Sequence, residues 1–98
     1  MSERLHCHIY IVDDEVHNLT LLSKLLTRHG FTRVTVNSDP EDALLQIPRS
    51  HCDLLLLDMS MPRLSGLELL EKLQPLVHGT PPLPVLVLTG DTRTDTRR

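Results

Sequence analysis

The sequence predicts an α/β domain built on a doubly wound parallel sheet. Short β-rich runs alternate with segments of helical periodicity, an order that is typical of parallel strands with helices on both faces of the sheet. Two of these runs are apolar at successive positions, as are strands that are buried on both faces. The length of 98 residues suits a single domain, and 40% hydrophobic residues suffices for one core.

The first strand and helix are expected in the amino-terminal third of the chain. Residues 6–12 predict the strand, because they are β-rich and end in a pair of acids. The helix is expected over residues 14–29, where apolar residues recur at helical spacing. Gly30 suits the position after that helix, because glycine tolerates a left-handed turn. The expected apolar stripe consists of Val16, Leu19, Leu22 and Leu26, widened by Leu21 and Leu25.

A second strand and helix follow. Residues 31–36 alternate in polarity and contain β-branched side chains, which predicts a strand. Residues 38–41 have the composition of a helix start, with a small polar residue, a proline near the first turn and acids near the positive end of the helix dipole. We expect this helix to run from about residue 40 to Ile47 and to be closed by Pro48.

The carboxyl-terminal half repeats the pattern. Residues 53–58 predict a central strand, residues 66–76 a helix and residues 84–89 a further short buried strand. Residues 90–98 have the composition of a helix opening whose body is absent. The apolar residues expected in register on the third helix are Leu67, Leu70 and Leu73.

Composition argues against several classes of function. The net charge is −3 and the 10 lysines and arginines are scattered, so we expect no direct nucleic-acid binding by this segment. The longest apolar run, residues 54–57, is too short for a membrane span, and the polar start gives no secretory signal, which favours a cytoplasmic domain. Cys7 and Cys52 are too few for a disulfide scaffold and are expected to be free, buried thiols. His6 and His8 flank Cys7, but no further ligand has zinc spacing, so a polar strand start is expected.

Polar chemistry follows three of the predicted strands. Asp13 and Asp14 follow the first, Asp58 ends the third, and Thr89 and Gly90 end the fourth. Ligands bind beyond the carboxyl ends of strands in open parallel sheets, so these groups would share one shallow cleft if the strands are neighbours. Carboxylates that converge repel one another unless a cation lies among them, and a set of oxygen ligands suits Mg²⁺.

Each of these groups also has an ordinary explanation. An aspartate after a strand often caps the next helix or forms a turn with its own backbone. A Thr-Gly pair is most often a plain turn. Neither explanation requires the acids to converge, so the joint arrangement favours a shared site.

The same segments carry a resemblance to a known family. Residues 12–15 (VDDE), 57–62 (LDMSMP) with Gly66, and 87–90 (VLTG) resemble, in this order, the receiver domain of two-component response regulators. The resemblance covers essentially the whole chain and implies a flavodoxin-like sheet of strand order 2-1-3-4-5. Here it implies the order 2-1-3-4, with the fifth strand and helix missing.

The resemblance implies a role for each acid. Asp58 would accept a phosphoryl group from a phosphohistidine on a sensor histidine kinase or phosphotransfer protein. Asp14 would bind Mg²⁺ directly, Asp13 partly through water, and the backbone carbonyl of Ser60 would supply a further metal oxygen.

Three further groups would contact the phosphoryl oxygens. The resemblance implies that Thr89 donates its hydroxyl to them, and that the backbone amides of Met59 and Gly90 face the same oxygens. The lysine that the family carries on its fifth strand has no counterpart here, because Lys24 and Lys72 lie within predicted helices.

The missing fifth unit leads to expectations about the chain. We expect residues 1–98 to be a single receiver domain that is truncated at its carboxyl end, with an output domain beyond residue 98 in the longer protein. The fourth strand would then be an unprotected apolar edge, and we expect dimerisation, exchange of elements or aggregation through it.

Two other functions remain open at this point. The chain could be a degenerate receiver-like interaction domain without phosphotransfer. It could instead be a phosphohydrolase with an aspartate nucleophile, although the haloacid-dehalogenase-like pattern needs a second aspartate where Ser60 stands. In the favoured interpretation the domain is a signalling switch that catalyses only its own phosphoryl transfer and hydrolysis.

Overall fold

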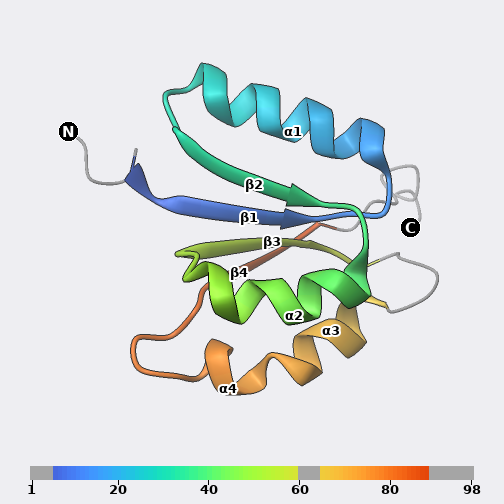
Figure 1. The fold of residues 1–98 in the computed structure, drawn as a ribbon, viewed down its shortest axis with the longest axis vertical. Coiled ribbons are helices and arrows are strands. Elements are labelled where there is room, and N and C mark those ends of the chain that lie inside the picture. Colours follow the sequence, from blue (N-terminus) through green and yellow to red (C-terminus); the bar gives the residue numbers. More distant parts are fainter. Residues whose placement is uncertain (1–5, 60–64, 89–98) are drawn as a thin grey trace, which may run out of the picture.

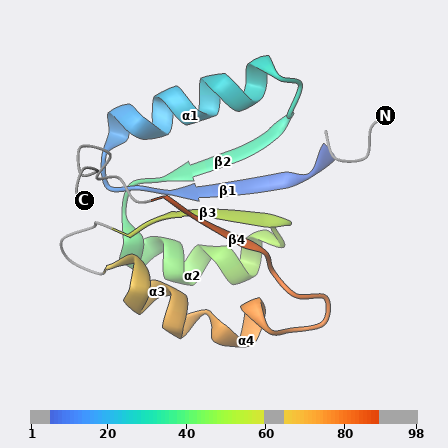
Figure 2. The same ribbon diagram turned by 180° about the vertical axis from the view of Figure 1, so that it is seen from behind.

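The computed structural model describes residues 6–59 and 65–88. Its sheet contains parallel strands in the order β2-β1-β3-β4, which confirms the predicted fold class and strand order. Helix α1 covers one face of the sheet, whereas α2, α3 and α4 lie on the other (Figure 1). The view from behind shows the same separation into three layers (Figure 2).

The first unit consists of β1 (His8–Val12) and α1 (Val16–Arg28). All of β1 is buried, because it lies between β2 and β3 and has helices above and below. Gly30 follows α1 with a φ of 98°, the left-handed conformation that favours glycine. The predicted stripe on α1 is narrower than expected: Leu19 is buried and Leu22 and Leu26 pack beside it, but Val16, Leu21 and Leu25 are exposed.

The second unit consists of β2 (Arg33–Asn37) and α2 (Pro40–Ser50). The side chain of Asp39 caps α2 by accepting hydrogen bonds from the amides of Glu41 and Asp42. The predicted end of this helix at Ile47 is wrong, because Pro48 lies inside its last turn. Proline at this point removes only one helical hydrogen bond, and the helix continues to Ser50, where His51 takes up a left-handed conformation.

The third helix is also different from the prediction. A single helix was expected over residues 66–76, but the structure has α3 (Gly66–Lys72) and α4 (Gln74–Val77), separated at Leu73. Pro75 explains the interruption, since it has no amide proton to continue the hydrogen-bond series. Leu69 and Leu73 provide the buried contacts of this segment, whereas Leu67 is exposed.

The remaining strands are β3 (Leu54–Asp58) and β4 (Val85–Leu88). The expected continuation after β4, residues 89–98, lies outside the described residues. Within the described parts of the chain, none of the helices has the length and apolar character that a bilayer span needs.

Two apolar cores lie on opposite faces of the sheet. Alternate residues of β1 and β3 point to each face, as the strand period requires. The core under α1 is formed by Ile9, Ile11, Leu19 and Leu56. The larger core under α2 and α3 is formed by Tyr10, Val12, Ala43, Ile47, Leu55, Leu57, Leu69, Leu73 and Leu83. These cores hold the carboxyl ends of β1 and β3 in a fixed relation.

Candidate metal and phosphoryl site

The register of the sheet brings two aspartates together. Val12 of β1 is the partner of Leu57 of β3, so the next residues, Asp13 and Asp58, lie side by side at the carboxyl end of the sheet. Both are buried, with exposed fractions of 3% and 5%, whereas Asp14 is exposed. The strand pairing therefore brings these two strand ends together, as the sequence predicted.

Asp13, Asp14 and Asp58 form a cluster of carboxylates. One ligand oxygen from each lies within 4.8 Å of the others. Carboxylates at such a separation repel one another, and burial of two of them weakens the screening by water. A divalent cation would relieve this repulsion, and the all-oxygen donor set with one exposed member fits Mg²⁺, which retains several waters.

Hydrogen bonds hold Asp13 in place. Its Oδ1 atom accepts the amide proton of Glu15 at 2.9 Å, and its Oδ2 atom lies 3.3 Å from the Nδ2 atom of Asn18, which donates. The ordinary explanation for an aspartate after a strand is thus partly true, because Asp13 forms a turn with its own backbone. It also belongs to the cluster, so the two roles coexist in one side chain.

Asn18 is a site residue that the sequence analysis missed. It lies in the first turn of α1, from which it reaches back to Asp13. The sequence feature that could have indicated this role is an amide side chain in the first turn of the predicted helix, four residues after Asp14. Asn18 positions the carboxylate without contributing a charge.

The start of α3 supports Asp58 from the other side. A Cβ atom at Gly66 would lie 2.5 Å from the backbone oxygen of Asp58 and 2.6 Å from the Cα of Met59, so only glycine fits. Ser65 caps α3: it accepts the amide proton of Glu68, and the Glu68 side chain accepts the amide proton of Ser65. The helix start is therefore fixed directly against the end of β3.

The amide of Met59, which is a predicted contact of the site, has a hydrogen-bond partner in the sheet. The amide of Met59 donates to the carbonyl of Leu88 at 3.1 Å, which extends the pairing of β3 with β4. It is engaged in the sheet in this structure, and the expectation that it meets the phosphoryl oxygens stays a prediction. Ser60, Thr89 and Gly90 lie outside the described residues.

The opposite end of the sheet has its own polar residues. His8 is buried; its Nε2 atom lies 2.8 Å from the Oγ1 atom of Thr35, and its amide donates to Asp53. Cys7 and Cys52 are free, as expected, but only half-buried. They pack against different cores, and burial raises the pKa of both thiols.

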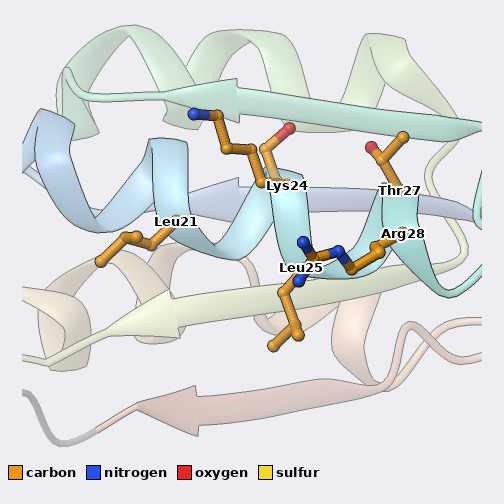
Figure 3. A pocket seen from close by; sticks show the side chains of 6 residues that line it. Leu21, Lys24, Leu25, Thr27 and Arg28 are labelled. Atoms are coloured by element: carbon orange, nitrogen blue, oxygen red, sulfur yellow. The ribbon is translucent and has the colours of Figure 1, made fainter.

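A surface cavity on α1 is separate from the carboxylate cluster. Leu21 and Leu25 point across the sheet toward β4, with Lys24 and Arg28 on the same helix (Figure 3). All of its lining residues belong to α1. It contains no acid and is not part of the site.

Fold and site together define a class of protein. In the order β2-β1-β3-β4, β2 lies on one side of β1, whereas β3 and β4 lie on the other. The direction in which strands are added to the sheet therefore reverses between β1 and β3, and ligands of doubly wound domains bind at such a switch point. The carboxylate cluster lies at that position. This is a doubly wound α/β domain whose acidic site lies at the switch point.

Comparison with known proteins identifies the family. Residues 9–98 match the family described as "Response regulator receiver domain", and the chain belongs to this family. It is 39% identical over 84 residues to PhoP, the alkaline phosphatase synthesis transcriptional regulatory protein of Bacillus subtilis, covering 84% of this chain and 32% of PhoP. The chain spans 14%, 32% and 18% of the length of three curated relatives that it matches.

Solved structures show the same relationship. The N-terminal domain of a response regulator receiver protein from Methanoculleus marisnigri is 30% identical with a TM-score of 0.71, over 84% of this chain and 65% of that one. The response regulator TrrA from Thermotoga maritima, solved in complex with Mg(2+)-BeF, is 27% identical with a TM-score of 0.72, over 92% of this chain and 76% of that one. The fold and the comparisons thus agree on membership of the receiver-domain family.

Proposed function

We propose that this receiver domain accepts a phosphoryl group on Asp58 in a Mg²⁺-dependent phosphorelay and acts as a signalling switch. The observation that supports this most directly is the convergence of Asp13, Asp14 and Asp58 within 4.8 Å. Asp58 is the member of the cluster that ends a central strand, where the sheet and Gly66 restrict its backbone. A carboxylate held in this way is suited to an in-line attack.

The proposed transfer is a single displacement at phosphorus. A carboxylate oxygen of Asp58 forms the new bond to phosphorus, while the bond from phosphorus to the donor histidine nitrogen breaks and its electron pair returns to the imidazole. The product is an acyl phosphate, which hydrolysis returns to the carboxylate. The domain would thus catalyse only its own modification and its reversal.

The neighbouring acids hold the cation in this proposal. The exposed Asp14 would bind it directly, and Asp13 partly through water, because both Asp13 oxygens already accept hydrogen bonds. Bound Mg²⁺ would offset the repulsion between the carboxylate and the anionic phosphoryl group. The backbone carbonyl of Ser60, the hydroxyl of Thr89 and the amides of Met59 and Gly90 complete the proposed set. The Met59 amide donates to the carbonyl of Leu88 in this structure and would exchange that partner for a phosphoryl oxygen.

The proposed phosphoryl donor is a sensor histidine kinase or a phosphotransfer protein. PhoP is a transcriptional regulatory protein, and by analogy this receiver would control an output domain in a longer protein. We place the domain in the cytoplasm, where its two free cysteines would stay reduced.

The test is phosphorylation of the isolated chain by a small donor. Incubation with Mg²⁺ and acetyl phosphate should add the mass of one phosphoryl group, and a beryllofluoride salt with Mg²⁺ should raise the melting temperature by mass action. Asp58→Asn should abolish both effects. Asp53→Asn is the matched control, because Asp53 precedes the same strand at its other end and should leave both effects unchanged.

A second set of variants separates binding of the cation from acceptance of the phosphoryl group. Asp14→Asn should weaken stabilisation by Mg²⁺ alone, whereas Asp42→Asn, an exposed acid outside the cluster, should not. If a full-length version that includes the fifth strand binds neither Mg²⁺ nor beryllofluoride, the degenerate interaction domain becomes the better interpretation. Phosphorylation that persists in Asp58→Asn would refute the assignment of the acceptor.

A further inference from the structure

The outer edge of β2 is a candidate interaction surface. In the sheet formed by the described residues, β2 is an end strand and pairs only with β1. An edge strand presents backbone donors and acceptors that a further strand can bind. The three central residues of β2, Val34, Thr35 and Val36, are all β-branched, which favours pairing in a sheet.

A hydrogen bond to the end of β1 reveals which backbone groups of β2 point outward. The carbonyl of Asn37 accepts from the amide of Asp13 and therefore points toward β1. Backbone groups of successive residues alternate in direction along a strand, so those of Val34 and Val36 point to the free edge. These two residues are the ones that can exchange hydrogen bonds with a new strand.

The α1 face of this edge is apolar and hollow. Val34 packs against the core under α1. By alternation, Val36 lies on the same face, where 43% of its surface is exposed. A cavity of about 530 Å³ lies beside Val36, between β2 and α1. The side chains of a second strand therefore have room to cover Val36 on this face.

The α2 face of the same edge carries charges of both signs. Thr35 lines a cavity of about 310 Å³ on this face, together with Asp42 and Arg49 of α2. By alternation, Arg33 and Asn37 share the face with Thr35. Arg33 is exposed at the amino end of β2, whereas Asn37 at the carboxyl end donates to the exposed carboxylate of Asp42 at 3.0 Å. A cation and an acid thus lie at opposite ends of the strand.

We propose that β2 pairs with β2 of a second copy of this protein, antiparallel, across a two-fold axis perpendicular to the sheet at Thr35. The alignment centred on Thr35 is the one that pairs all 5 residues of the strand. Val34 of each copy exchanges backbone hydrogen bonds with Val36 of the other. The two Thr35 residues form a non-hydrogen-bonded pair, whose Cα atoms lie about 4.5 Å apart.

A second copy fits this edge because the charges of the strand are complementary under the two-fold axis. The axis places the amino end of one β2 against the carboxyl end of the other, so Arg33 lies opposite Asn37 of the second copy. That asparagine holds Asp42 by a hydrogen bond, and the guanidinium of Arg33 can therefore pair with the Asp42 carboxylate. The contact occurs twice, and the closed pairing leaves no free β2 edge for further growth. The proposal is independent of phosphorylation at Asp58.

Sedimentation velocity over a range of concentrations tests the association. A full-length version that includes the fifth strand is used, so that β4 does not offer an edge of its own. This protein should show a monomer–dimer equilibrium. Arg33→Glu places like charges together on both sides of the axis and should raise the dimer dissociation constant about tenfold. Lys72→Glu is the matched control, because it makes the same change of charge at an exposed position of α3, and it should leave the constant unchanged.

Reversal of both charges tests the contact between Arg33 and Asp42. Asp42→Lys alone should weaken the dimer as Arg33→Glu does, because it faces Arg33 of the other copy. The double variant Arg33→Glu and Asp42→Lys restores opposite charges across the axis, so its dissociation constant should return to within about threefold of the wild-type value. Lys72→Glu combined with Asp42→Lys has the same net charge as that double variant but should remain weak, which separates the contact from an effect of net charge.

Cross-linking tests the register. In a Cys7→Ser and Cys52→Ser background, Thr35→Cys should form a disulfide between copies on mild oxidation, because paired residues at a non-hydrogen-bonded site lie within reach. Val36→Cys should not, because residue 36 of one copy faces residue 34 of the other. Circular dichroism of each variant confirms that the fold is retained.

Three results would overturn the proposal. The first is a protein that stays monomeric at its highest soluble concentration. The second is a dimer whose dissociation constant responds equally to Arg33→Glu and Lys72→Glu, which would place the interface elsewhere. The third is a disulfide that forms in Val36→Cys but not in Thr35→Cys, which would exclude the axis at Thr35.

Discussion

Substitution of Gly66 by alanine tests how closely α3 is coupled to β3, the strand that ends in the proposed phosphoacceptor. The added Cβ would lie 2.5 Å from the Asp58 backbone oxygen, 2.5 Å from the Met59 sulfur and 2.6 Å from the Met59 Cα. The sulfur could move aside, because it is part of a flexible side chain. The two backbone atoms cannot, so either α3 or the end of β3 must shift.

The expected cost follows from these contacts. Overpacking of this kind costs about 1–3 kcal/mol. The higher helix propensity of alanine offsets at most about 1 kcal/mol of it. We therefore expect Gly66→Ala to lower the free energy of unfolding by about 1–2 kcal/mol, where each kcal/mol lowers the melting temperature by about 4–8 °C for a domain of this size.

The assay combines urea unfolding with the phosphorylation test. Gly66→Ala should lower the urea midpoint and slow the modification of Asp58 by acetyl phosphate. Gly79→Ala is the control: its Cβ would lie 2.8 Å from the Pro75 carbonyl oxygen, so it should cost stability without slowing the modification. An unchanged midpoint in Gly66→Ala would refute the steric argument, and an equal loss of modification in both variants would refute the coupling to Asp58.

Three further predictions concern stability. Leu57→Ala removes a fully buried side chain of the larger core and should cost about 2–5 kcal/mol in urea unfolding, whereas the exposed Leu45→Ala should cost less than about 0.5 kcal/mol; equal costs would contradict the assigned core. Ser65→Ala removes the capping box of α3 and should cost about 1 kcal/mol by the same measurement, and no loss would show that the cap is dispensable. Burial raises the pKa of the Cys52 thiol above its ordinary value of 9.0, so this thiol ionises at a lower pH in the unfolded chain than in the folded chain. The stability that it contributes is therefore fully present below pH 9.0 and is lost as the pH rises through the folded pKa. Stability measured by urea unfolding should therefore fall less steeply above pH 9.0 in Cys52→Ala than in the wild type, and identical slopes would contradict the shift.

Most of the site could be predicted from the sequence because the relevant signals are local. An acid directly after a strand lies at the carboxyl edge of a parallel sheet, whatever the details of the packing. Asp13 and Asp58 each follow such a run, so their convergence required only that their strands be neighbours. The strand order then made them so.

The contacts of individual groups were less predictable. The hydrogen bond from the amide of Met59 to the carbonyl of Leu88 was not predicted, because the sequence does not report that β3 extends its pairing by one residue. The role of Asn18 depends on the angle at which α1 leaves the sheet, which periodicity does not report. Leu21 and Leu25 have helical spacing, yet α1 turns them toward a face that the described residues leave open.

The two prolines show most clearly which features the sequence determines and which depend on the tertiary structure. Sequence alone determined that α/β alternation, the acidic strand ends and the glycine after α1 would occur, because each depends on neighbours in the chain. It did not determine whether Pro48 or Pro75 would interrupt its helix, since either proline in a helix interior removes one hydrogen bond but is tolerated in a first turn. Tertiary packing decided the outcome: α2, anchored by Ala43 and Ile47 in the core, continues past Pro48, whereas the chain turns at Leu73 before Pro75 and keeps that leucine buried.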